Sequence, residues 1–289
     1  MHSFYGVPAW KLALFGCDFE LLGILADIIT PFADGGDIDV AALDQHVNRL
    51  VDVGVHGLVP GGSTGEFAAL MVEERSILTE TCIKSAAGRI PVVAGTSDLK
   101  CKGAVELAVH DAQAGAAAVI VIPPYYEAHN LEETRELLQD IHTASGLPIV
   151  YYNIPSIRGL TLSAQDIASL SDVGVKYLKD TSGNAPVLTD LLLTYGQKIT
   201  IFNDLDTLTF YGLAAGTKGS IWGADYLKKG REVWEKIFPI CMELRGWKTG
   251  GVRKPFAPLK EGPQAELAAL LESARVKRES QCQASPVKG

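Results

Sequence analysis

Short apolar segments alternate along most of the chain with longer segments of helical periodicity. Several of the apolar segments lack polar alternation, which is typical of strands whose two faces are both covered. We predict eight strands, over residues 22–32, 55–60, 90–96, 117–124, 148–155, 175–181, 199–203 and 219–223.

The segments between these strands carry apolar residues every three to four positions, the spacing of one helix face. Leu43, Val47 and Leu50 form such a stripe. The Ser163 hydroxyl can cap a helix start, and Asp166 suits the positive end of that helix. We predict helices over residues 40–53, 73–87, 103–114, 131–144, from 163 onwards, 186–195, 205–215 and 232–244.

Eight strand–helix pairs within about 250 residues predict an α/β fold, a (β/α)8 TIM barrel with additional C-terminal helices. A doubly wound open sheet is the alternative, but no Gly-x-Gly-x-x-Gly follows the first strand. We expect an N-terminal appendage over residues 1–21, the barrel over 22–225, a C-terminal helical region over 226–277 and a disordered tail over 278–289.

Composition narrows the possible partners. The 289 residues are 47% hydrophobic and 21% charged, which excludes a disordered chain. The formal net charge is −8, and Lys and Arg do not cluster before the C-terminal tail, so we expect no nucleic-acid partner. No apolar run reaches the roughly 18 residues of a membrane span, so we expect no membrane partner either.

Cysteine and histidine spacing bears on redox compartment and metal binding. The five cysteines are odd in number and form no Cys-x-x-Cys pair, which favours a reducing, cytoplasmic location and argues against structural zinc. The apolar stretch before Cys17 is too short for an export signal. The six histidines show no His-x-His or His-x-x-x-His spacing, so we expect no metal site.

The predicted strand over 175–181 carries the most reactive candidate. In a barrel of this kind the chemistry lies at the C-terminal ends of the strands. Lys176 and Lys179 differ by an odd number of positions and should point to opposite faces, with Lys179 at the exit end. Burial lowers the pKa of an amine, and a neutral amine attacks a ketone to form a Schiff base. The alternative is a lysine whose charge reaches water beyond the strand.

Two other strand ends carry polar groups. Only one of Tyr151 and Tyr152 can face the barrel interior, where a phenol could relay protons if its pKa is lowered. The glycine-rich run over residues 61–66 follows the second strand and includes Ser63 and Thr64. Its backbone N–H groups and hydroxyls could cradle a carboxylate, although such a run is often only a turn.

Three motifs together resemble the dihydrodipicolinate synthase / N-acetylneuraminate lyase family. They are GGSTGEF at residues 61–67, YYNIP at 151–155 and YLKDTSGN at 177–184, each at a predicted strand end. The resemblance covers about residues 22–275. It implies a class I aldolase, a lyase that forms a Schiff base with pyruvate or another 2-oxo acid and makes or breaks a C–C bond, with or without dehydration. It implies no cofactor, because the imine itself is the electron sink, and it implies a homo-oligomer, either a tetramer or a dimer of dimers.

The resemblance also assigns roles to single residues at the strand ends. Pro123-Pro124-Tyr125-Tyr126 resembles a segment whose second tyrosine reaches the site of a neighbouring subunit. The implied roles are Schiff-base lysine for Lys179, proton carrier for Tyr152, relay for Thr64 and Tyr126, carboxylate ligands for Gly62, Ser63 and Thr64, and a backbone position near the lysine for Ile221.

The chain departs from both named branches where the second substrate binds. Ile157 stands where the synthase has an arginine, and Arg158 follows one position later. Asp206 is followed by Thr207 instead of the second acid of the lyase, and Trp222 is larger than the residue expected there. We expect Arg158, Asp206 and Trp222 to contact the substrate. The alternatives are dihydrodipicolinate synthase proper, which joins pyruvate to aspartate semialdehyde, and a barrel that binds a metabolite without turnover.

Overall fold

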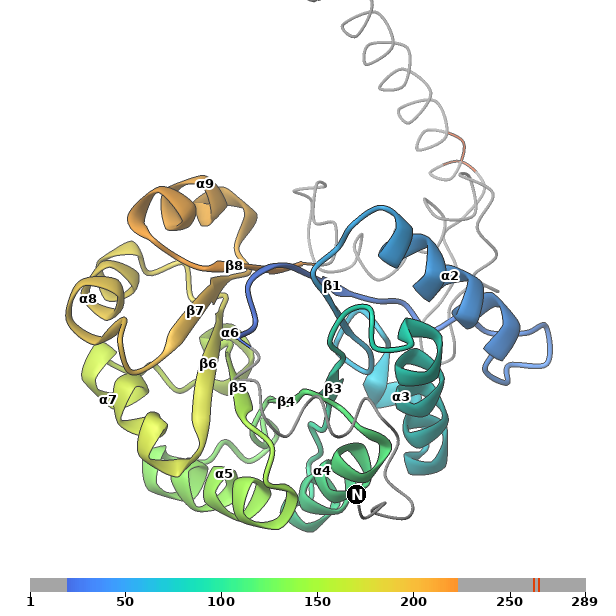
Figure 1. Cartoon of the computed structure of the whole chain (residues 1–289). Helices are drawn as coiled ribbons and strands as arrows, with labels where there is room; N and C mark the ends of the chain where they lie inside the picture. Colours follow the sequence, from blue (N-terminus) through green and yellow to red (C-terminus); the bar gives the residue numbers. More distant parts are fainter. Residues whose placement is uncertain (1–19, 223–261, 263–264, 266–289) are drawn as a thin grey trace, which may run out of the picture. The chain divides into compact units, whose positions relative to one another are not determined.

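The strands form one parallel sheet in a computed structural model that describes residues 20–222, 262 and 265 (Figure 1). The strand order is β2-β1-β8-β7-β6-β5-β4-β3. The strands are β1 (Gly23–Asp27), β2 (Gly57–Val59), β3 (Val93–Gly95), β4 (Ala118–Val121), β5 (Ile149–Asn153), β6 (Val175–Asp180), β7 (Thr200–Asn203) and β8 (Gly219–Trp222).

The two ends of this sheet meet, and the barrel is nearly closed. Leu58 N donates to Pro91 O at 3.0 Å, and Gly95 N donates to Pro60 O at 2.9 Å, so backbone hydrogen bonds join β2 to the β3 segment. The predicted (β/α)8 barrel is therefore confirmed, and the open-sheet alternative is excluded. All of the predicted strands are present, each shorter than its apolar run.

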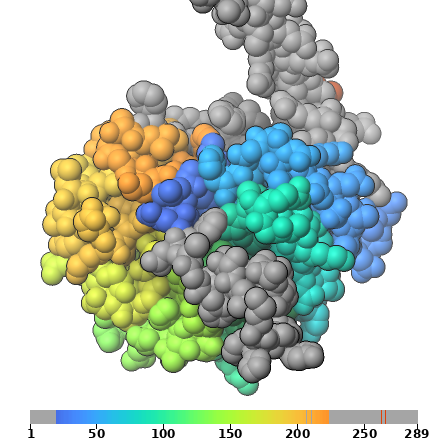
Figure 2. Space-filling view, in the orientation of Figure 1, coloured from blue at the N-terminus to red at the C-terminus, as the bar shows by residue number. Residues whose placement is uncertain are grey.

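Helices lie outside the strands (Figure 1). Ser163 caps α7 as predicted, accepting a hydrogen bond from Asp166 N at 3.1 Å. In the space-filling view α2 and α3 lie side by side (Figure 2), and the Ser85 hydroxyl donates to Asp44 between them. The helices are α2 (Val40–Asp52), η1 (Phe67–Ala69), α3 (Val72–Ala86), α4 (Cys101–Ala114), α5 (Leu131–Ser145), α6 (Pro155–Arg158), α7 (Ala164–Ser169), η2 (Leu170–Val173), α8 (Ala185–Tyr195) and α9 (Asp206–Ala215).

The chain divides into two compact units. One comprises residues 1–30 and 43–223 and contains the barrel; the other comprises residues 31–42 and 224–289. The predicted helix over 232–244, almost all of the C-terminal helical region and the predicted tail lie outside the described residues. The N-terminal appendage was predicted to extend to residue 21, yet the Leu21 side chain is 2% exposed and belongs to the barrel's inner core.

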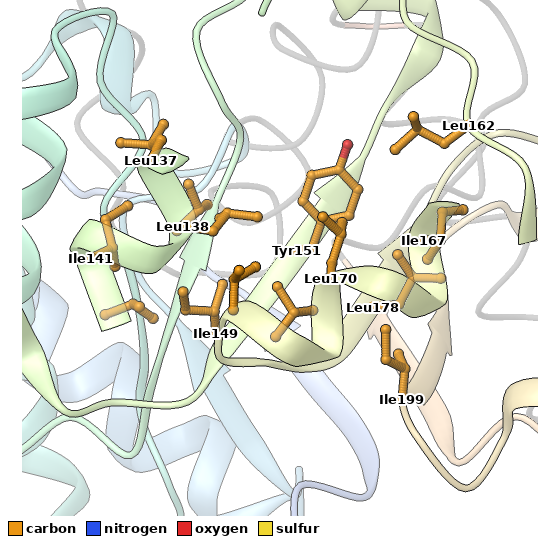
Figure 3. Packing of buried hydrophobic residues seen from close by; sticks show 14 of the residues in the cluster. Leu137, Leu138, Ile141, Ile149, Tyr151, Leu162, Ile167, Leu170, Leu178 and Ile199 are labelled. Atoms are coloured by element: carbon orange, nitrogen blue, oxygen red, sulfur yellow. The ribbon is translucent and has the colours of Figure 1, made fainter. Parts of the chain in front are cut away.

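Apolar side chains form two layers, because successive residues of a strand point to opposite faces. Along β5, Val150 and Tyr152 face the barrel interior, whereas Ile149 and Tyr151 face the helices. Figure 3 shows the helix-facing layer, in which Tyr151 lies among leucines and isoleucines of neighbouring elements. The inner core is Leu21, Leu25, Val59, Val93, Ala118, Ile120, Ile122, Val150, Tyr152, Tyr177, Phe202 and Ile221.

Barrel closure depends on Gly95, where the backbones of two segments touch. A Cβ atom on Gly95 would lie 2.1 Å from Gly61 O and 3.0 Å from Pro60 O, and a rigid backbone cannot yield as a side chain can. We expect Gly95→Ala to lower the free energy of unfolding by about 3 kcal/mol or more, at the upper end of overpacking costs. Urea unfolding followed by circular dichroism measures this.

The matched control is Gly35→Ala, because an added Cβ there has open space within 4 Å. Its free energy of unfolding should stay within about 0.5 kcal/mol of the original chain. Equal urea midpoints for Gly95→Ala and Gly35→Ala would contradict this account of closure.

Candidate active site

Lys179 lies inside the barrel near the C-terminal end of β6. Lys176 has no partner in the β5–β6 register, and this irregularity shifts the strand phase so that Tyr177 faces inward. Two residues later the Lys179 side chain also points inward and is 3% exposed. Its ammonium nitrogen lies 2.5 Å from Asp27 Oδ2 and 3.5 Å from Asp204 Oδ2.

The two carboxylates come from strands that flank β8. Asp27 is the last residue of β1, and Asp204 directly follows β7. In a parallel barrel all strands end at the same rim, so residues far apart in sequence meet there. Burying a charged amine is costly unless it is paired. These carboxylates supply the pairing for Lys179.

Tyr152 completes the group on the side of β5. It is the register partner of Lys179, and the lysine nitrogen lies 4.3 Å from the centre of the Tyr152 ring. The Tyr152 hydroxyl donates to Asp204 Oδ2 at 3.2 Å. We call Lys179, Asp27, Asp204 and Tyr152 the lysine cluster.

The electrostatics of the lysine cluster differ from the sequence expectation. Burial acts to lower the pKa of Lys179, but Asp204 and Asp27 outweigh it and hold that pKa above its ordinary value. The lysine therefore rests as an ammonium ion rather than as the neutral amine that burial alone would produce. The expected lowering of the Lys179 pKa is wrong, because the sequence did not reveal the two carboxylates.

The pKa values of Tyr152 and Asp204 are also raised. Burial raises the pKa of Tyr152, and Asp204 and Asp27 add to this, although Lys179 opposes them. Tyr152 is therefore a hydroxyl donor and a poor base. Burial also raises the pKa of Asp204 to about 7, even with Lys179 beside it. Asp204 is thus able to gain or lose a proton near neutral pH.

The glycine-rich run borders this cluster. Asp27 Oδ1 faces Gly62, because a Cβ atom built on Gly62 would lie 2.7 Å from that oxygen. Ser63 and Thr64 follow in the same loop, the first exposed and the second half-buried. Within the loop, Gly65 N donates to Gly62 O and Glu66 N to Ser63 O. The predicted carboxylate cradle therefore lies next to the lysine cluster.

Other predicted site residues lie at different positions. Ile221 is buried in the inner core, and its neighbour Trp222 is half-buried. Tyr126 is 85% exposed in this chain. Asp206 opens α9, but the placement of its side chain lies outside the description; Thr207 is exposed.

Arg158 is not part of the lysine cluster. It ends the short helix α6, and its guanidinium group donates to the Tyr151 hydroxyl at 2.8 Å and to Thr134 Oγ1 at 3.0 Å. Tyr151 belongs to the helix-facing layer (Figure 3), so Arg158 is bound on the other side of the β5 strand from Lys179. We therefore leave Arg158 out of the proposed substrate site.

Sequence reasoning missed Asp27 and Asp204. A signal was present for Asp27, which is the lone acid in the apolar run from Ile24 to Ile29. Such an acid is rarely buried without a partner, so it pointed to a cation inside the barrel. Asp204 gave a weaker signal, because an acid directly after a strand is also common in loops.

The chain is similar in sequence and structure to proteins of one family. The model of the Dihydrodipicolinate synthetase family matches residues 20–231. A 4-hydroxy-tetrahydrodipicolinate synthase from Methanothrix thermoacetophila is 35% identical over 283 residues, covering 86% of this chain and 95% of that one. One from Oceanobacillus iheyensis is 32% identical over 199 residues, 68% of each chain. The solved structure of YagE in complex with pyruvate, a prophage protein of the dihydrodipicolinic acid synthase family from E. coli K12, has a TM-score of 0.81 and 25% identity, covering 88% of this chain and 98% of that one.

Residues 20–222, 262 and 265 contain no group of three His, Cys, Asp or Glu side chains placed to hold a metal ion. No helix within that part of the chain combines the length and apolarity needed to cross a bilayer.

The raised pKa of Asp204 predicts a pH effect on stability. The carboxyl binds its proton more tightly in the folded chain, with a pKa of about 7, than at its ordinary value of 3.8. The contribution of this carboxyl group to the free energy of unfolding is therefore fully present below pH 4 and is lost as the pH rises through 7. The stability of the original chain relative to Asp204→Asn should fall by on the order of 2 kcal/mol between pH 5 and pH 8.

Urea unfolding of both proteins at the two pH values measures this difference. Groups common to both proteins cancel, including His110 and Asp111, which also titrate with raised pKa values. A difference that stays constant or grows with pH would mean that Asp204 is ionised throughout this range.

Proposed function

Because the chain belongs to the dihydrodipicolinate synthetase family, whose members are class I aldolase-type lyases and synthases, we propose that it forms a Schiff base between Lys179 and a 2-oxo acid such as pyruvate. The observation that carries the proposal is a lysine inside the barrel, at the C-terminal end of β6, beside Tyr152 and the glycine-rich loop. Active sites of barrel enzymes occupy this rim.

Each residue of the site has its own role in the proposed Schiff-base reaction. The amine of Lys179 attacks the ketone carbon, and the imine then draws electrons from the adjacent carbon and makes it acidic. The loop at Gly62, Ser63 and Thr64 holds the substrate carboxylate with N–H and hydroxyl donors. Tyr152 donates its hydroxyl proton when the C–C bond forms or breaks, and Asp204, which accepts the hydrogen bond of that hydroxyl and has a pKa of about 7, supplies or takes up the proton. The imine accepts the electrons, so the proposal needs no metal or organic cofactor.

The proposal includes an assembly and a location. Tyr126 is an aromatic side chain that is 85% exposed in the single chain, which supports a contact with a neighbouring subunit. Thr64 would then link Tyr126 of the neighbour to Tyr152 as a relay. We propose a homo-oligomer, a tetramer or a dimer of dimers, and the odd number of cysteines favours the cytoplasm.

Trapping the imine tests the central proposal. Sodium borohydride added with pyruvate should reduce the imine and leave one stable adduct per chain, visible by intact mass. Peptide mapping should place the adduct on Lys179. Lys179→Met should form none, and Lys176→Met, the matched control on the same strand, should form it normally.

An adduct on Lys176, or no adduct at saturating pyruvate, would overturn the assignment of Lys179. Pyruvate that binds reversibly but resists borohydride would instead favour the alternative of a barrel that binds a metabolite without turnover.

The environment of Lys179 also narrows the second substrate. Asp27 and Asp204 place two carboxylates at the site, and Arg158 is bound in the helix-facing layer. A second carboxylate on the substrate would meet like charge, and Arg158 is not placed to pair it. A buried polar group left unpaired costs about 1–3 kcal/mol, or roughly one to two decades in kcat/KM. We propose a 2-oxo-3-deoxy acid, or pyruvate with a simple neutral aldehyde.

A substrate panel tests this preference. Pyruvate release or consumption should show a kcat/KM at least tenfold higher for a 2-oxo-3-deoxy acid or a simple aldehyde than for aspartate semialdehyde or N-acetylneuraminate. The bulk of Trp222 adds to the expected rejection of a nine-carbon sugar acid. If aspartate semialdehyde is preferred more than tenfold, the chain is a dihydrodipicolinate synthase proper and Arg158 moves to reach the substrate.

A further inference from the structure

We propose that Asp27 is a catalytic residue that carries the protons of imine formation, taking them from the Lys179 nitrogen and delivering them to the departing oxygen of the substrate. The inference rests on the proposed function, because it assumes that Lys179 forms an imine. It adds a residue on β1 to a site that the sequence motifs place on β2, β5 and β6.

The charge on Lys179 decides the first step of imine formation. Asp204 and Asp27 hold the lysine in its ammonium form, which has no lone pair and cannot attack a ketone. The first event must therefore be loss of a proton to a nearby base. Asp27 Oδ2 is in direct contact at 2.5 Å, whereas Asp204 Oδ2 is 3.5 Å away, beyond a good hydrogen bond.

Asp204 is also the less suitable acceptor for a second reason. The oxygen that faces Lys179, Oδ2, already accepts the hydroxyl hydrogen of Tyr152. Tyr152 cannot take the proton either. Burial and the carboxylates raise the pKa of its hydroxyl, so that its oxygen already carries a proton. Among the described residues around the lysine nitrogen, Asp27 is the best-placed base.

The second oxygen of Asp27 faces the expected substrate position. Asp27 Oδ1 is buried and has no hydrogen-bond partner among the described residues. It lies against Gly62, at 2.7 Å from where a Cβ atom would be, and Gly62 belongs to the proposed carboxylate cradle. A buried polar atom without a partner is costly, so its persistence needs an explanation. The hydroxyl group that forms from the substrate's ketone oxygen during imine formation can donate to this oxygen and supply the missing partner.

Asp27 can carry every proton that is transferred during imine formation. Lys179 gives a proton to Asp27, and its free electron pair forms the C–N bond while the carbonyl π electrons move to oxygen. Asp27 protonates that oxygen, takes a second proton from the nitrogen and gives it to the resulting hydroxyl group. The C–O bond breaks, water leaves and the remaining nitrogen electrons form the C=N bond. Both protons of the released water thus come from the lysine nitrogen, and Asp27 begins and ends as a carboxylate.

Rapid-quench borohydride trapping with pyruvate measures this step directly, without the second substrate. Asp27→Asn keeps the shape of the side chain but removes the base. We expect the rate of adduct formation on Lys179 to fall by about 10²–10⁴-fold at pH 7, the usual contribution of general acid–base catalysis. Asp204→Asn, which removes a carboxylate but leaves Asp27 in contact with the lysine, should speed up trapping, because it lowers the pKa of Lys179.

Whether Asp27→Asn slows or speeds up trapping distinguishes a proton carrier from a residue that only places negative charge near Lys179. If Asp27 only held charge near Lys179, its removal would lower the pKa of the lysine, provide more neutral amine and speed up trapping. A proton carrier predicts slower trapping despite that gain. It also predicts that Asp27→Asn recovers as the pH rises from 7 to 9, by about tenfold per pH unit, because solvent then removes the lysine proton.

A second variant covers the case in which Asp27→Asn folds poorly. Asp27→Ala leaves space for formate, and added formate should restore the trapping rate in proportion to its concentration, with acetate as a larger control. Wild-type chain without an adduct would overturn the proposed function and this inference together. An adduct that forms as fast in Asp27→Asn as in the wild type, or one whose rate in Asp27→Ala ignores formate, would overturn the role of Asp27 alone.

Discussion

The ammonium group of Lys179, buried between Asp27 and Asp204, is the contact on which the rest of the site depends. A charge inside the barrel is tolerated only while its partners are in place, and removal of one partner from a buried pair typically costs about 3–5 kcal/mol. The two carboxylates come from β1 and the end of β7, and the lysine comes from β6. The cluster therefore requires that strands from both ends of the sequence lie side by side, which the parallel register across β6, β7, β8 and β1 provides.

This arrangement sets the chemistry that the site can perform. The two carboxylates keep Lys179 in its ammonium form, so the proposed Schiff-base chemistry requires a proton transfer from Lys179 to a carboxylate. Asp204 has a pKa of about 7 and can exchange a proton near neutral pH. The hydroxyl of Tyr152 extends the cluster from β5. The proton-handling groups of this site are thus mainly carboxylates, with the tyrosine as a donor.

The alternation of β5 explains why neighbouring residues have unrelated roles. Tyr152 faces Lys179, while Tyr151 packs among apolar side chains of the helix-facing layer (Figure 3) and accepts a hydrogen bond from Arg158. Arg158 ends α6 and its side chain lies on that outer side, where Thr134 of α5 also accepts a hydrogen bond from it. An arginine expected to contact substrate thereby joins helices to the barrel wall, and it brings no positive charge to the lysine cluster.

The sequence by itself determined the order of strands and helices, the barrel class and the position of Lys179 at the end of its strand, because apolar runs, helical periodicity and strand-end motifs are local patterns. It also placed Ser163 at a helix start, which needs only neighbouring residues. Asp27 and Lys179 are 152 positions apart in sequence, and only the tertiary structure decided that they are in contact. It alone also decided that Arg158 lies on the helix-facing side of β5. Sequence spacing carries no information about which distant side chains converge, and the sign of the Lys179 pKa shift depends on that convergence. Burial alone would have lowered this pKa, whereas burial beside two carboxylates raises it.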